Sequence, residues 1–121
     1  FKCVGKVIWL NRESDIDRVT AISGSGPAYF FLFIEHLISE AIKLGLKKNI
    51  AKELVYQTAF GSIDLLLKSK KSAGELKKSI AVKGGTTEAA INIFESKSLF
   101  KKIINKALFS AYNRSKKIGS D

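Results

Sequence analysis

A scarcity of chain-breaking residues is the feature that most limits how this chain can fold. Its 121 residues include one proline, Pro27, and nine glycines. Proline and glycine end helices and form the turns of strand-rich sandwiches, so their scarcity permits long helices and disfavours a sandwich. The sequence therefore predicts an all-α domain.

Helix-start and helix-stop residues divide the chain into six predicted helices. The first is capped by Ser14 and ends in a flexible, polar break at Ser23–Gly26. The second begins at Pro27 and runs to about Leu44, with Gly45 as its stop. The remaining four are expected at these positions: Asn49 to about Lys68, Ser72 with Glu75 as a capping box to about Ala81, Thr86 or Thr87 to about Glu95, and Ser98 through Tyr112.

The first turns of the second helix are apolar on every side. The run Ala28–Ile34 contains no charged residue and is followed by Glu35 and His36. Such a helix is expected to be buried on most sides, inside a core or between subunits. A single short domain covers such a surface with difficulty, so we expect an intertwined homodimer.

The strongly positive charge leaves two interpretations open. The formal net charge is +10, but only three of the 21 basic residues are arginines. Arginine is the better ligand for phosphates and base edges, and the lysines are spread along the whole chain as on a solvated surface. A basic module that binds nucleic acid therefore stays as the alternative function, and we expect no nucleic acid as a partner.

Single cysteine and histidine residues exclude several kinds of chemistry. Cys3 and His36 cannot form a metal site together. We expect Cys3 to be an inert packed thiol and His36 to be an ordinary helix residue. One cysteine allows no internal disulfide, which suits a reducing cytoplasm.

The segment Phe1–Leu10 is predicted to be a short strand or an extended lead-in, and no apolar run is long enough for a membrane span. Because the chain begins at Phe1 and not at Met, we interpret it as an excerpt of a longer protein.

Two glycine-containing loops that run into helix starts are the candidate binding sites. They are Ser23-Gly24-Ser25-Gly26-Pro27 and Val82-Lys83-Gly84-Gly85-Thr86-Thr87. Backbone N–H groups and the helix dipole favour anions at such places, although both loops could also be plain turns with polar caps. The first loop is not a dinucleotide fingerprint, because Tyr29 stands where the third glycine belongs and no βαβ unit surrounds it.

Both loops lie in stretches that resemble one enzyme family. The string Val19–Tyr29, with Ser-Gly-Ser-Gly-Pro at its centre, is similar to a signature of the pyrroline-5-carboxylate reductases. The stretch Leu76–Ala90 resembles the second signature of that family, and the turn Gly45-Leu46 and the closing Ala111–Ser115 also fit. The resemblance covers essentially the whole chain.

The resemblance implies a reductase whose cofactor-binding half is missing here. In that family a Rossmann domain binds NAD(P)H, and a helical domain of the 6-phosphogluconate dehydrogenase C-terminal-like class interlocks with its twin. Residues 1–121 would be this helical substrate-binding and dimerisation domain, within an enzyme that reduces pyrroline-5-carboxylate to proline with NADP or NAD as its cofactor. Dimers could assemble further, and the isolated chain is expected to be inactive. A domain from another dehydrogenase fits the two signatures less well.

The resemblance also implies roles for the two loops. Gly84, Gly85, Thr86 and Thr87 would surround the substrate, whose carboxylate would be held by backbone N–H groups. The hydroxyl of Thr87 would form a hydrogen bond with the ring nitrogen, which gains a proton in the reaction. Thr87 is therefore the candidate catalytic residue. Val82 stands where the family usually has a serine that helps to hold the carboxylate. The loop Ser23–Pro27 would lie near the nicotinamide end of the cofactor.

Overall fold

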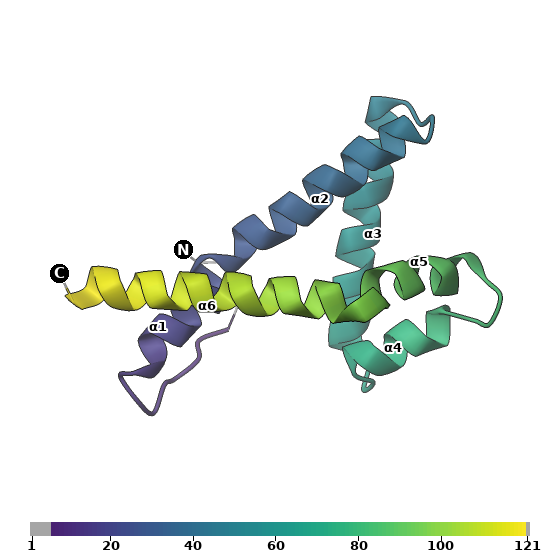
Figure 1. Ribbon diagram of the computed structural model, residues 1–121. Helices are drawn as coiled ribbons and strands as arrows, with labels where there is room; N and C mark the ends of the chain where they lie inside the picture. The colour runs from purple at the N-terminus through teal and green to yellow at the C-terminus, as the bar shows by residue number, and fades with distance from the viewer. Residues whose placement is uncertain (1–5, 121) are drawn as a thin grey trace. The chain divides into compact units, whose positions relative to one another are not determined.

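All regular structure in the described part of the chain is helical. The computed structural model describes residues 6–120, and the prediction of an all-α fold is confirmed for this range (Figure 1). In chain order the elements are α1 Asp15–Val19, a π-helical turn Thr20–Gly24, α2 Gly26–Lys43, α3 Lys48–Lys68, α4 Ala73–Ile80, α5 Thr86–Glu95, a 3-10 turn Ser96–Ser98 and α6 Leu99–Ser120. Lys6–Leu10 form no strand, and Cys3 lies outside the described residues. Within the described range no helix is long and apolar enough to cross a membrane.

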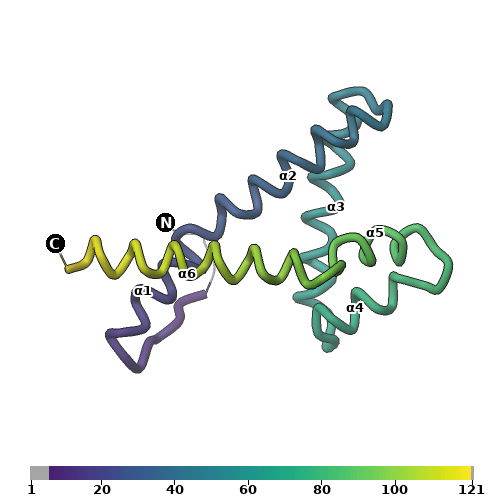
Figure 2. The backbone as a smooth tube through the Cα atoms, in the orientation of Figure 1, coloured from purple at the N-terminus to yellow at the C-terminus, as the bar shows by residue number. Residues whose placement is uncertain are grey.

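The contacts divide the chain into two units. The first joins the chain up to Pro27 with the segment from Ile104 onward, and the second comprises Ala28–Ile103. Helices α2 and α6 each have residues in both units. The path of the backbone can be followed in Figure 2.

In the first unit, α1 is joined to α6 by polar side chains that are far apart in the sequence. The hydroxyl of Ser115 donates a hydrogen bond of 2.7 Å to Oδ1 of Asp17, and both side chains are partly buried. The guanidinium of Arg18 lies 5.4 Å from the centre of the Tyr112 ring, and the ammonium of Lys116 lies 5.2 Å from it. A hydrogen bond to a charged carboxylate is among the stronger ones, so these contacts fix α1 against α6.

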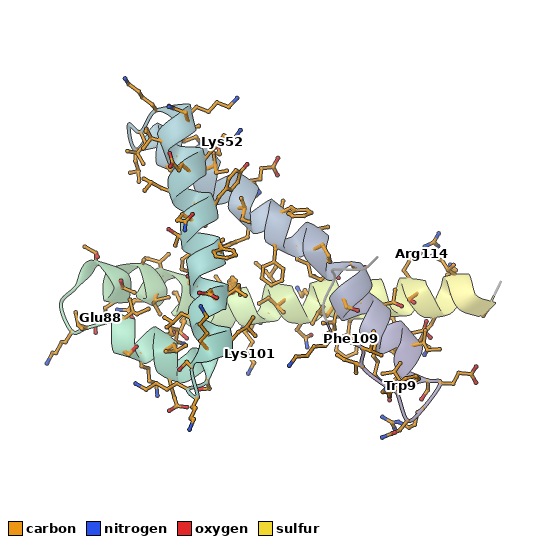
Figure 3. All side chains as sticks on the ribbon, turned by 180° about the vertical axis from the view of Figure 1, so that it is seen from behind. Trp9, Lys52, Glu88, Lys101, Phe109 and Arg114 are labelled. Carbon is orange, nitrogen blue, oxygen red and sulfur yellow. The ribbon has the colours of Figure 1, made fainter. Side chains whose placement is uncertain are left out.

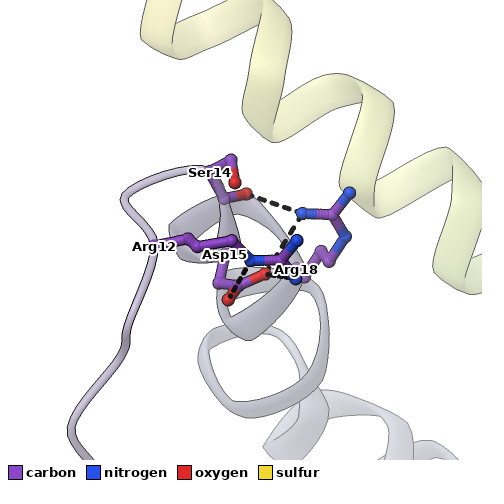
Figure 4. Close-up of polar contacts among 4 residues, drawn as sticks. All are labelled: Arg12, Ser14, Asp15 and Arg18. Atoms are coloured by element: carbon purple, nitrogen blue, oxygen red, sulfur yellow. Dashed lines mark hydrogen bonds and ion pairs between the residues drawn. The ribbon is translucent and has the colours of Figure 1, made fainter.

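The start of α1 is held by two arginines that share one carboxylate. Arg12 and Arg18 both contact Oδ1 of Asp15, at 3.1 and 3.2 Å (Figure 4). Arg18 also donates to the carbonyl of Ser14 at 3.0 Å. Ser14 precedes α1 as predicted, but its side chain makes no capping hydrogen bond.

The first helical segment ends within the predicted break at Ser23–Gly26, but it does so as a π-helical turn that reaches Gly24 and leaves one bend at Ser25. The N–H of Ser25 donates to the carbonyl of Thr20, five residues back, at 2.9 Å. The hydroxyls of Thr20 and Ser23 donate to the carbonyls of Ile16 and Val19, at 2.9 and 3.0 Å. Hydroxyl side chains that donate to a carbonyl four residues back compete with the backbone hydrogen bonds of a helix and often bend it, which fits a widened turn at this place.

In the second unit, a short turn joins α2 to α3. Gly45 lies at the end of α2 with a φ of 115°, the left-handed conformation that glycine adopts easily, so its role as the stop is confirmed. Ala51 on α3 is fully buried. Phe94 on α5 contacts Phe33 on α2 and Phe100 on α6, with ring centres 6.4 and 5.6 Å apart. The Phe94–Phe100 pair is edge-to-face and the Phe33–Phe94 pair is tilted, and both arrangements are favourable for aromatic rings.

The predicted helix starts are correct where the side chain itself makes the cap. Ser72 and Glu75 form the complete capping box, with both bonds at 3.1 Å. Asn49 is not the cap of α3, which begins after Lys47. Lys47 has an extended backbone and marks the start without using its side chain.

Two further helix starts are shifted by one residue. Neither Thr86 nor Thr87 caps α5, because Gly85 holds the cap position in extended conformation. Ser98 belongs to a 3-10 turn and has a φ of 56°, so α6 begins at Leu99. The predicted ends of α3 at Lys68 and of α5 at Glu95 are confirmed.

Few apolar side chains are covered within the chain. Among the described residues, only Ala21 and Ala51 are buried hydrophobics. The apolar turns of α2 remain largely uncovered, with Phe30 and Phe31 63% and 68% exposed. The expectation that this helix is buried on most sides is therefore not met by the chain's own residues.

Candidate functional site

The loop between α4 and α5 has a backbone that depends on its two glycines. Gly84 has a φ of 78°, which costs a residue with a side chain about 1–2 kcal/mol. Gly85 donates its N–H to the carbonyl of Val82 at 3.0 Å. A Cβ atom on Gly85 would come within 3.0 Å of Cγ2 of Val82 and 3.1 Å of its carbonyl oxygen. Val82 therefore packs so closely against Gly85 that a residue with a side chain would not fit at position 85 without a shift.

The first turn of α5 presents backbone donors. The N–H of Ala89 bonds to the carbonyl of Gly85 at 3.3 Å and closes this turn. The N–H groups of Thr86, Thr87 and Glu88 come before it and have no partner among residues 6–120. Free N–H groups at the positive end of a helix dipole are suited to an anion. The half-buried side chain of Thr87 makes no hydrogen bond within the described chain, so its hydroxyl is available to a ligand.

Glu88 is a feature of this loop that the sequence analysis missed. Its carboxylate oxygen Oε1 accepts the N–H of Gly84 at 3.0 Å. Glu88 is half-buried and is labelled on α5 in Figure 3. The signal was present in the sequence, since a glutamate at the third position of a helix often reaches back toward the residues before it.

The loop Ser23–Pro27 directly precedes and opens α2. The hydroxyl hydrogen of Ser23 is already used by the carbonyl of Val19, so this side chain can only accept a further hydrogen bond. Gly26 is buried at the start of α2, and a Cβ atom on it would meet nothing within 4 Å. Gly24 packs against the methyl group of Thr20, which a Cβ would approach to 3.5 Å.

The two candidate loops lie in different units. Ser23, Gly24, Ser25, Gly26 and Pro27 belong to the first unit, whereas Val82–Thr87 belong to the second. Each loop precedes a helix start in its own unit. In residues 6–120 no three side chains of the metal-binding types gather in one place.

Helices, an uncovered apolar surface and a glycine loop at a helix start together define an all-α domain of the kind that pairs with another subunit. A family model described as pyrroline-5-carboxylate reductase dimerisation matches residues 13–118. The chain belongs to this family.

Similar proteins carry the same name. The chain is 43% identical to pyrroline-5-carboxylate reductase of Pseudomonas aeruginosa over 112 residues, which are 93% of the chain and 41% of that protein. It resembles the solved pyrroline-5-carboxylate reductase of Coxiella burnetii with a TM-score of 0.89 and 43% identity, covering 94% of the chain and 42% of that structure. It also resembles the Plasmodium falciparum pyrroline carboxylate reductase with NADP bound, with a TM-score of 0.86 and 41% identity, covering 93% of the chain and 43% of that structure. The chain thus spans about two-fifths of the length of these relatives.

Proposed function

We propose that the chain is the dimerisation and substrate-binding part of a pyrroline-5-carboxylate reductase. The observation that carries the proposal is the Val82–Thr87 loop, where a left-handed Gly84 leads into a helix start with unpaired N–H groups. The family match over residues 13–118 supports it. The complete enzyme would reduce the C=N bond of 1-pyrroline-5-carboxylate to form L-proline. Residues 1–121 would form one helical functional domain in that enzyme.

The substrate loop would act by holding and orienting the substrate. The N–H groups of Thr86 and Thr87 would donate to the substrate carboxylate, with Gly84 and Gly85 leaving room for a close approach. The hydroxyl of Thr87 would donate to, or accept from, the ring nitrogen as this atom gains its proton. Val82 has no hydroxyl, so the carboxylate would be held by backbone donors alone. Such positioning lowers the barrier because the reacting atoms are held close together.

The loop Ser23–Pro27 would contact the nicotinamide end of the cofactor. It supplies one helix start and no strand–helix–strand unit, so the described chain fits one end of a dinucleotide and not its full length. When bound, NADPH or NADH supplies the hydride, and most of its binding would belong to another domain. Support comes from the Plasmodium falciparum relative, which was solved with NADP. The single cysteine and the biosynthetic role suit a cytoplasmic location.

Two copies of the chain would interlock as a homodimer. An apolar groove runs between α2 and α3, lined by residues that include Phe30, Phe33, Leu37, Leu54 and Ile63. Its lining is almost free of polar groups, and the chain's own residues do not fill it. Because the family is a dimerisation domain, helices of a second copy are the best occupant. Dimers could then assemble into a higher oligomer.

The experiment that tests the substrate site is Thr87→Val in the complete enzyme. This change keeps the shape and removes only the hydroxyl. If that hydroxyl supports the developing charge on the ring nitrogen, kcat/KM falls roughly 10- to 1,000-fold. Since the hydroxyl makes no hydrogen bond within the described chain, the melting temperature should barely change. Ser79→Ala, which removes an exposed hydroxyl of α4, serves as the control.

Two results would count against this role. Full kcat/KM in Thr87→Val would show that the hydroxyl takes no part in the reaction. A complete wild-type enzyme that forms no proline from pyrroline-5-carboxylate and NADPH would remove the proposed activity itself. Elution from heparin or DNA tests the nucleic-acid alternative separately. Binding to phosphates must weaken steeply as salt rises, so an elution that does not depend on salt would exclude this alternative.

A further inference from the structure

The carboxylate of Glu88 already occupies one donor of the proposed substrate loop. Its oxygen Oε1 lies 3.0 Å from the backbone nitrogen of Gly84. Glu88 is half-buried, and within residues 6–120 no lysine or arginine forms an ion pair with it. The charge of this side chain is therefore balanced by the Gly84 N–H and by the positive end of the α5 dipole.

A capping box does not fully account for this contact. In a capping box, the glutamate bonds the N–H of the cap residue, and a serine or threonine at the cap returns a bond. Here the cap is Gly85, which has no side chain, and the bond reaches one residue further back to Gly84. The complete box at Ser72 and Glu75 shows the usual arrangement in the same unit.

The same helix start is the one that the substrate carboxylate needs. Glu88 accepts from Gly84, whereas the substrate carboxylate would accept from Thr86 and Thr87, but two carboxylates at one helix start repel each other. Among the charged residues of the loop, Lys83 is exposed and forms no ion pair in the described range, so it does not neutralise Glu88. The substrate would have to bind beside Glu88 or displace it from Gly84.

We propose that Glu88 is a specificity-determining residue that competes, through its own carboxylate, with the carboxylate of the substrate for the N-terminus of α5. This inference rests on the proposed reductase function. It assigns Glu88 a role in substrate affinity: the side chain holds Gly84 in place when the loop is empty and raises the concentration of substrate needed to fill it. A ligand without a carboxylate gains nothing from displacing it.

Glu88→Gln in the complete enzyme is the direct test. The amide oxygen of glutamine can still accept the N–H of Gly84, so the loop keeps its shape and loses only the charge. The KM for pyrroline-5-carboxylate should fall roughly 2- to 30-fold, the range expected for one charge at a helix N-terminus. The KM for NADPH should stay at its wild-type value. The dissociation constant of L-proline, measured by calorimetry on the same enzyme, should fall by a similar factor.

Glu95→Gln provides the matched control. It removes the same charge from the other end of the same helix, where Glu95 is exposed and pairs with Lys77 at 2.9 Å. The KM for pyrroline-5-carboxylate should stay at the wild-type value. Glu88→Ala, which removes the acceptor as well as the charge, separates the two contributions: a melting temperature lower than that of Glu88→Gln shows how much the Gly84 contact stabilises the loop.

An unchanged or raised KM and L-proline dissociation constant in Glu88→Gln would overturn the inference, and would leave Glu88 as a structural cap. An equal fall in KM in Glu95→Gln would also overturn it, because the effect would then come from net charge alone. If the wild-type complete enzyme reduces pyrroline-5-carboxylate in these assays, such results affect only the role of Glu88. A wild-type enzyme without that activity would overturn the proposed function together with this inference.

Discussion

Replacing Phe31 with alanine should weaken the proposed dimer strongly. Phe31 lies in the second turn of α2, between the apolar residues Phe30 and Leu32, and it is 68% exposed in the single chain. If a second copy covers this turn, Phe31 becomes buried on association. Alanine keeps the helix, because it has the highest helix propensity, and removes only the ring.

The size of the effect follows from the exposed fraction. Full burial of a phenylalanine side chain is worth about 1.5–3 kcal/mol, and about two-thirds of Phe31 remains to be covered. Each subunit would therefore lose about 1–2 kcal/mol of association free energy. A two-fold symmetric dimer contains the site twice, so the total is about 2–4 kcal/mol, which raises the dissociation constant roughly 30- to 700-fold.

Sedimentation equilibrium of the 121-residue chain at several concentrations measures this change directly. Wild type should be a dimer at micromolar concentration, and Phe31→Ala should dissociate within the accessible range. Glu40→Ala on the same helix is the control, since it removes an exposed side chain that pairs with Lys43 and should leave the dissociation constant unchanged. Because folding and association are coupled, the melting temperature of each variant should rise with protein concentration.

A wild-type chain that stays monomeric at micromolar concentration would refute the reasoning, because the uncovered apolar turns would then have no partner copy. Equal dissociation constants for wild type and Phe31→Ala would also refute it. That result would show that a dimer forms through another surface and that α2 stays in contact with water.

Three further predictions concern stability and the isolated chain. Ser115→Ala, which removes the donor to Asp17, should lower the free energy of unfolding by about 1–3 kcal/mol in urea denaturation, and a loss below experimental error would show that α1 is held by other contacts. Gly84→Ala should cost about 1–2 kcal/mol because of the positive φ, whereas Gly74→Ala inside α4 should be neutral or stabilising by the same measurement. The isolated chain should form no proline and bind NADPH only weakly in fluorescence titration, because residues 6–120 contain no strand–helix–strand unit; tight binding would contradict this prediction.

Much of the fold could be predicted because local signals determine where helices begin and end. Ser72 and Glu75 specify a start through their own side chains, and Gly45 specifies a stop through its conformation. Asn49 was misleading because a capping side chain is not required when an extended residue such as Lys47 precedes the helix. Propensity thus identified the helices, and errors of one or two residues arose where the backbone alone sets the boundary.

Other features depend on information that no local pattern contains. The π-helical turn at Thr20–Gly24 changes the hydrogen-bond spacing from four residues to five without changing the spacing of apolar residues. The hydrogen bond from Gly84 to Glu88 depends on the backbone conformation of the loop before α5, which places the Gly84 N–H within reach of the carboxylate. The apolar pattern around Phe31 predicts burial inside a core or between subunits and cannot tell the two apart, and the ring is exposed in the single chain.

The bond between Asp17 and Ser115 also affects the order in which the chain can fold during synthesis. The two residues are 98 positions apart, and the first unit is built from both ends of the described chain. Helices from α3 to α5 can meet their partners while translation continues, whereas α1 must wait until α6 has left the ribosome. Long-range contacts of this kind form slowly. The apolar turns of α2 belong to the second unit and stay exposed in the single chain, so closure of the first unit does not shorten the time for which a nascent chain presents them.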